Sequence, residues 1–114
     1  MLQVNTVLQT NNGTPQYATP GAAGCDLKAE LTLINDKFLF NALKDIDNTC
    51  LVIRPNGRAL IPTGLHISLP KGYEAHVRPR SGLALKYGIT VLNTPGTIDA
   101  SPKTQIKINY IINF

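Results

Sequence analysis

Apolar and polar residues alternate most regularly at the C-terminal end of the chain. From Ile106 to Asn113 every second residue is apolar, and Ile111 adds one apolar residue to the otherwise polar face. A period of two is typical of a β-strand with one buried face, and the additional isoleucine indicates a strand that is covered on both faces near its end. We therefore expect a strand whose core-facing residues are Ile106, Ile108, Tyr110 and Ile112.

Earlier in the chain, short apolar runs lie between clusters of turn-forming residues. Three such runs have the length of strands, namely 59–61, 65–69 and 73–77. Clusters rich in Gly, Pro and Asn separate these and other segments, at 11–13, 19–21, 54–57, 62–64, 70–72 and 94–96. Closely spaced short strands and turns predict an all-β sandwich or barrel.

Two segments have helical character. Ser81 stands at a possible N-cap, good helix formers follow it, and Gly88 closes the segment, which predicts one or two helical turns. The second segment, Asp36 to Asp47, has apolar residues at helix-like spacing and predicts another helix. The apolar residues from Phe38 to Phe40 leave a second interpretation open, in which a strand begins there.

Composition and charge narrow the function classes. With 114 residues we expect a single domain, 1–114, and 43% hydrophobic residues predict a folded chain. The net charge of +4 suits phosphate-bearing small molecules better than direct nucleic-acid binding, because aromatic residues make up 6% and tryptophan is absent. No membrane span or secretion signal is visible and two cysteines do not predict a disulfide scaffold, so we expect a cytoplasmic protein with reduced thiols.

Arg80-Ser81-Gly82 forms a candidate phosphate site. The guanidinium offers forked donors, the serine adds a hydroxyl, the following helix would supply amide groups at its N-terminus, and Gly82 lets a ligand approach the backbone. An ordinary helix start with a solvated arginine is the alternative.

The turn-rich segment from Asn93 to Asp99 carries a second candidate site. Asn93 can read the amide-like edge of a base, and Asp99 can deprotonate an attacking water while a divalent cation offsets phosphate charge. An aspartate in an Asx-turn is the alternative. The chain contains no GxSxG, P-loop, GxGxxG or zinc-deaminase signature, so those enzyme classes have no support.

Three segments in order resemble the trimeric dUTPase family. Residues 18–27 (ATPGAAGCDL) are similar to its first motif, 79–82 (PRSG) to its second, and 93–99 (NTPGTID) to the front of its third. The resemblance implies a β jelly roll with one short helix after the phosphate-binding motif, and a homotrimer whose three subunits build shared active sites. The reaction implied is the hydrolysis of dUTP to dUMP and pyrophosphate with Mg²⁺.

The resemblance also implies a role for each matching residue. Asp26 would neighbour the metal through water, and Asp99 would be the catalytic base. The expected substrate-binding residues are Arg80, Ser81 and Gly82 on the phosphates, Asn93 on uracil, Thr97 and Ile98 along the deoxyuridine through backbone groups, and Lys107 on the nucleoside strand.

The sequence departs from the family pattern in two places. Pro102 stands where the family has a tyrosine that packs on the deoxyribose, so rejection of ribonucleotides should weaken. The fourth and fifth motifs are not found, so we expect a fold that is incomplete at its C-terminal end and a site without its glycine-rich lid. Two alternatives to a dUTP diphosphatase therefore stay open: a catalytically impaired module that binds a nucleotide or a protein, and a relative of the dCTP deaminases.

Overall fold

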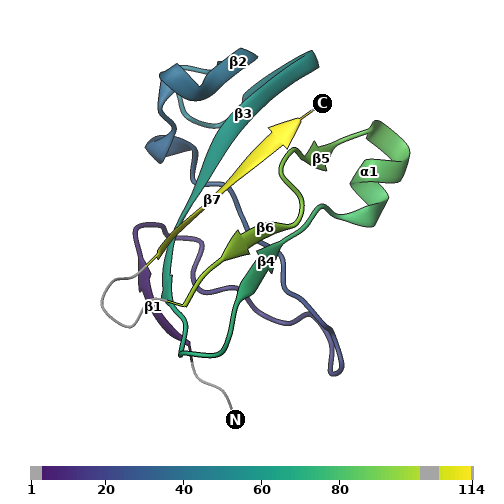
Figure 1. Cartoon of the computed structure of the whole chain (residues 1–114). Helices are drawn as coiled ribbons and strands as arrows, with labels where there is room; N and C mark the ends of the chain where they lie inside the picture. Colours follow the sequence, from purple (N-terminus) through teal and green to yellow (C-terminus); the bar gives the residue numbers. More distant parts are fainter. Residues whose placement is uncertain (1–3, 101–105, 114) are drawn as a thin grey trace.

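The computed structural model describes residues 4–100 and 106–113, the second range by its backbone. Within these residues the chain is built of strands: β1 (Asn5–Leu8), β2 (Leu39–Lys44), β3 (Leu51–Ser68), β4 (Ala75–Val77), β5 (Thr90–Val91), β6 (Gly96–Ile98) and β7 (Ile106–Asn113). One α-helix, α1 (Ser81–Tyr87), and two 3₁₀ turns, η1 (Leu31–Leu33) and η2 (Asp36–Phe38), complete the described elements (Figure 1). The predicted all-β class is confirmed.

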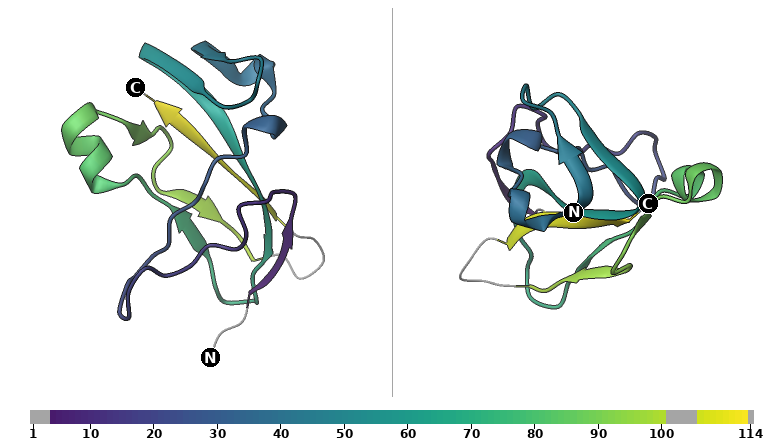
Figure 2. Two further views of the ribbon diagram at one scale, coloured as in Figure 1. Left: turned by 180° about the vertical axis from the view of Figure 1, so that it is seen from behind. Right: turned by 90° about the horizontal axis from the view of Figure 1, so that it is seen from above.

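Strand β3 is the centre of the larger sheet. Strand β7 pairs with one of its edges, β1 and β2 pair with different parts of the other edge, and β5 pairs with β7, all antiparallel. Strands β4 and β6 form a separate two-stranded antiparallel sheet. This ribbon lies on the opposite side of β3 and β7 from the N-terminal segment, so the molecule has more than one layer (Figure 2).

The buried core lies along the second half of β3. Of the hydrophobic side chains described, five are buried: Ala59, Ile61, Leu65, Leu69 and Val91. Full burial of a Leu, Ile or Val side chain contributes about 1.5–3 kcal/mol, so this stretch anchors the sheet. Thr63 is also buried, and its hydroxyl oxygen accepts a hydrogen bond from the amide of Leu65 at 3.1 Å.

Two predicted turns are wrong, because both lie inside β3. The clusters at 54–57 and 62–64 bend the strand but do not end it. Asn56 has a φ of 66° and Gly64 a φ of 70°, both left-handed, and the register with β7 shifts between Pro62 and His66. Gly and Asn accept this backbone conformation readily, so the residues that commonly mark a turn here mark irregularities within a strand.

The predicted helix from Asp36 to Asp47 is also wrong. A single 3₁₀ turn, η2, is followed directly by β2, so the strand interpretation of this segment is the one that holds. The side chain of Asn35 caps the turn by accepting a hydrogen bond from the amide of Lys37 at 3.0 Å. Pairing with β3 overrides the helical spacing, since it satisfies the backbone of β2 across the sheet.

The helix predicted after the phosphate-binding motif is confirmed, with one correction at its start. It ends at Tyr87 with Gly88 as the C-cap at a φ of 68°. Ser81 is its first helical residue and not the N-cap, which is Arg80 in an extended conformation without a side-chain capping bond. The strand predicted at 106–113 is confirmed as β7, but the orientation of its side chains lies outside the described residues.

The loop that joins β2 to β3 is organised by Asp45. Its Oδ1 accepts hydrogen bonds from the amides of Thr49 at 2.8 Å and Cys50 at 3.1 Å, and its Oδ2 accepts one from the Thr49 hydroxyl. The side-chain bond from Thr49, followed by the amides and Lys44, lowers the pKa of Asp45 below its ordinary value. The carboxylate is thus bound in its charged form.

Asp45→Asn should lower the free energy of unfolding at neutral pH and make it less dependent on pH. Because the pKa of Asp45 is lower in the folded chain, its carboxylate stabilises the fold above the unfolded pKa, and this contribution disappears as pH falls through the folded pKa. Urea unfolding of both proteins from pH 7 to pH 3 measures the difference, which should shrink as the pH falls. Asp47→Asn removes the same charge two residues away but keeps the hydrogen bonds that Asp45 accepts, so it is the control for the loss of charge alone.

Candidate active site

The phosphate-binding candidate lies where the chain leaves β4 and enters α1. Arg80 is extended and its side chain is 68% exposed, while its carbonyl accepts the hydrogen bond of the Ala84 amide at 3.0 Å. A Cβ on Gly82 would meet nothing within 4 Å, so the space beside this glycine is open. An arginine and a serine therefore stand at an accessible helix start with room for a ligand.

Asp26 lies beside this candidate, although it is 54 positions earlier in the chain. Its Oδ1 is 3.7 Å from Nε of Arg80, and both side chains are 68% exposed. Such an exposed pair contributes at most about 1 kcal/mol to stability. The pair matters for its position, because it shows that the fold brings residues of the first and second sequence motifs side by side.

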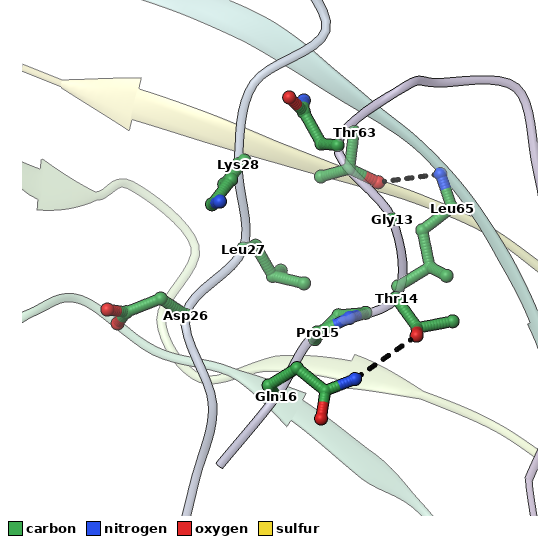
Figure 3. Close-up of a pocket in the computed structure, with 10 residues that line it drawn as sticks. Gly13, Thr14, Pro15, Gln16, Asp26, Leu27, Lys28, Thr63 and Leu65 are labelled. Carbon is green, nitrogen blue, oxygen red and sulfur yellow. Dashed lines mark hydrogen bonds between the residues drawn. The ribbon is translucent and has the colours of Figure 1, made fainter. Parts of the chain in front are cut away.

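The residues around Asp26 also line a hollow of about 280 Å³. Its walls come from the loop at 12–16, the segment at 26–28, and Thr63 and Leu65 of β3 (Figure 3). The carboxylate of Asp26 points away from Gln16 and the other walls of this hollow, so the ion pair with Arg80 lies outside it (Figure 3). The hollow could not be predicted from the sequence, because Asn12-Gly13 indicates a turn but not what the turn packs against.

The base-reading candidate lies between β5 and β6. The amide of Thr94 donates to the carbonyl of Val91 at 3.1 Å, which closes a turn with Asn93 inside it. Asn93 is folded back onto the first residue of β6, since a Cβ on Gly96 would lie 3.4 Å from its Nδ2. Thr97 and Ile98 then follow in β6, whose backbone pairs with β4.

Asp99 and Arg80 do not meet within one chain. In the β4–β6 ribbon Val77 pairs with Gly96 and Ala75 pairs with Ile98, so the two strands run in opposite directions. Arg80 follows the end of β4 that leads to α1, whereas Asp99 follows the other end of the ribbon (Figure 1). The two halves of the predicted site therefore lie at opposite ends of one small sheet.

Lys107 is placed by its backbone in β7, opposite His66 of β3. The direction of its side chain lies outside the described residues, as does Pro102. The two histidines have structural partners: Nε2 of His66 is 3.0 Å from Oε1 of Gln9, and Nε2 of His76 is 2.8 Å from Oε1 of Glu74.

The carboxylate oxygens of Asp26 fit a divalent cation that is also held by phosphate groups and water. Mg²⁺ commonly keeps several waters and binds through one or two carboxylates together with substrate phosphates. Asp26 supplies one exposed carboxylate beside Arg80, the candidate phosphate-binding arginine. In the described part of the chain, no group of three or more His, Cys, Asp or Glu side chains is arranged to hold a metal. The site therefore fits a cation bound through phosphates and water, with Asp26 as its protein neighbour.

The family model and the relatives that match this chain all point to the same family. The model of the dUTPase family matches residues 46–114. Three relatives named deoxyuridine 5′-triphosphate nucleotidohydrolase come from Chlamydia pneumoniae, Treponema denticola and Beijerinckia indica, and they are 46%, 45% and 51% identical to this chain. The matches cover 94%, 94% and 82% of this chain but 62%, 63% and 50% of the relatives.

This chain thus spans between half and two thirds of the length of these relatives. The family model covers more than half of the chain and includes Arg80, Asn93 and Asp99. No helix in the described residues has the length and apolar character needed to cross a membrane. The chain belongs to the dUTPase family, and its all-β fold with one short helix is the β jelly roll of that family.

Proposed function

We propose that this protein hydrolyses dUTP to dUMP and pyrophosphate at sites formed between copies of the chain. The observation that carries the proposal is the ion pair between Asp26 and Arg80, which joins two of the family motifs at one exposed helix start. The relatives named deoxyuridine 5′-triphosphate nucleotidohydrolase support the choice of substrate.

One group of residues binds the phosphate end of the nucleotide, and a second group binds its base and sugar. Arg80 and the Ser81 hydroxyl donate hydrogen bonds to the phosphates, and Gly82 lets them approach the backbone. At the other end, Asn93 reads the uracil edge, since its amide both donates and accepts, while backbone groups of Thr97 and Ile98 and the strand that carries Lys107 line the deoxyuridine.

Asp99 takes a proton from the attacking water as the water oxygen bonds to the α-phosphorus. The α–β phosphoanhydride bond then breaks, and the electron pair leaves with pyrophosphate. When bound, Mg²⁺ offsets negative charge on the phosphates, with Asp26 as its neighbour through water.

The assembly that we propose is a homotrimer. A site that needs Arg80 from one end of the β4–β6 ribbon and Asp99 from the other end is completed by a second copy. Contact between two different surfaces of identical chains continues head to tail until a ring closes, and three copies form a small ring of this kind. We also place the protein in the cytoplasm, which agrees with its two cysteines, Cys25 and Cys50, neither of which forms a disulfide.

Release of pyrophosphate from dUTP in the presence of Mg²⁺ tests this function. We expect turnover of dUTP with kcat/KM at least about 100-fold above that for dCTP, because cytosine leaves the polar groups of a uracil site unpaired. Chelation of Mg²⁺ should abolish the reaction. Tight dUMP binding without turnover would show a nucleotide-binding module, and release of ammonia from dCTP would show a deaminase; either result contradicts the proposal.

A further inference from the structure

Gly96 lies beside the side chain that we propose to read uracil. It is the first residue of β6 and pairs with Val77 of β4. A Cβ built on Gly96 would lie 3.4 Å from Nδ2 of Asn93, 3.6 Å from Cβ of Val77 and 3.7 Å from the Val77 carbonyl oxygen. The space between the Asn93 amide and the neighbouring strand therefore has room for about one methyl group at van der Waals distance.

We propose that Gly96 is a positioning residue that fixes the direction of the Asn93 amide and thereby sets the selectivity for uracil. This inference rests on the proposed function, since Asn93 has to be the base-reading group. Larger side chains at position 96 would displace the Asn93 amide from the position in which it meets the uracil edge. A displacement of a few tenths of an ångström already weakens hydrogen bonds, whose strength depends on distance and direction.

The size of the space gives a graded expectation. Alanine fits at the limit of contact, so Gly96→Ala should lower dUMP affinity by about threefold or less. Valine adds two methyl groups beyond that limit, and Gly96→Val should lower dUMP affinity by about tenfold or more, which is the loss of one hydrogen-bonded contact. The backbone of Gly96 does not have a positive φ, and valine is favourable in strands, so β6 should keep its stability.

Two ligands separate an effect on the base from an effect on the rest of the site. Calorimetric titration of the wild type, Gly96→Ala and Gly96→Val with dUMP and with 2-deoxyribose 5-phosphate gives both affinities, and thermal unfolding checks the fold. We expect the loss in Gly96→Val for dUMP alone, with affinity for the sugar phosphate unchanged within about twofold. Equal losses for both ligands would overturn the positioning role.

A double-mutant cycle identifies the partner. If Gly96 acts through Asn93, Gly96→Val should cost less than about twofold in dUMP affinity once Asn93→Ala is present. The same tenfold cost in both backgrounds would show that valine disturbs β6 or Val77 directly, and would overturn the inference alone. A wild type that binds dUMP no better than the sugar phosphate would overturn the proposed function, and this inference with it.

Discussion

Replacing Gly57 with alanine should lower the free energy of unfolding by about 3 kcal/mol or more. A Cβ at this position would lie 2.5 Å from the carbonyl oxygen of Asn41, 2.8 Å from that of Arg54 and 3.0 Å from that of Phe40. All three atoms belong to the backbone, which cannot rotate away as a side chain can. The added methyl group therefore has to separate β2 from β3 or reshape the bend in β3.

Urea unfolding with circular dichroism measures this loss. Gly24→Ala is the matched control, because a Cβ there meets nothing within 4 Å, and it should stay within about 0.5 kcal/mol of the wild type. Hydrogen exchange gives a second measurement of the pairing between β2 and β3. The amides of β2 should exchange with solvent faster in Gly57→Ala than in the control. If Gly57→Ala were as stable as the control, the close approach of β2 to Gly57 would be wrong.

The elements that could be predicted from sequence are those with a local cause. The alternation from Ile106 to Asn113 predicts β7, and good helix formers between Arg80 and Gly88 predict α1. In both cases the pattern and the terminating residues lie within the segment itself. For α1 only the N-cap differs by one position: the sequence predicted Ser81, and the structure has Arg80.

The predictions were wrong where pairing between strands that are distant in sequence determines the secondary structure. The spacing of Phe38, Leu39, Ala42 and Leu43 favours a helix, but the registry with β3 places Leu39 opposite Ala59 and Leu43 opposite Val52. Asn41 adopts a φ of 52° at an irregularity in this pairing, a role that nothing in the local pattern indicates. A left-handed Asn or Gly has the same sequence signature in a turn and in a bulge. The predicted turns at 54–57 and 62–64 therefore divide β3, although the strand only bends there.

The candidate site shows the same division. Short motifs predict which residues make up the candidate site, and Asp26 and Arg80, which come from two of these motifs, form an ion pair in the structure. The separation of Asp99 from Arg80 was not predictable from the motifs, because it follows from the direction and register of β4 and β6. This geometry is the physical support for a site that two chains complete.

Asp99→Asn and Arg80→Ala should each lower kcat/KM for dUTP by about 100-fold or more, because one removes the proposed base and the other a proposed phosphate ligand. The two variants unfolded and refolded together should recover activity. In a ring where each site takes Arg80 from one copy and Asp99 from the next, about one quarter of the sites in an equal mixture receive both native residues.

The recovery should appear only when chains can exchange. Variants refolded separately and then mixed are the first control, and a mixture of Asp99→Asn with the double variant Arg80→Ala/Asp99→Asn is the second, since no site in it has a native Asp99. Both should remain at the level of the single variants, while the co-refolded pair approaches about a quarter of wild-type pyrophosphate release. A co-refolded pair that stays inactive, although both variants fold and assemble, would mean that Arg80 and Asp99 act within one chain. The chain would then have to rearrange the β4–β6 ribbon, whose register holds the two residues at opposite ends.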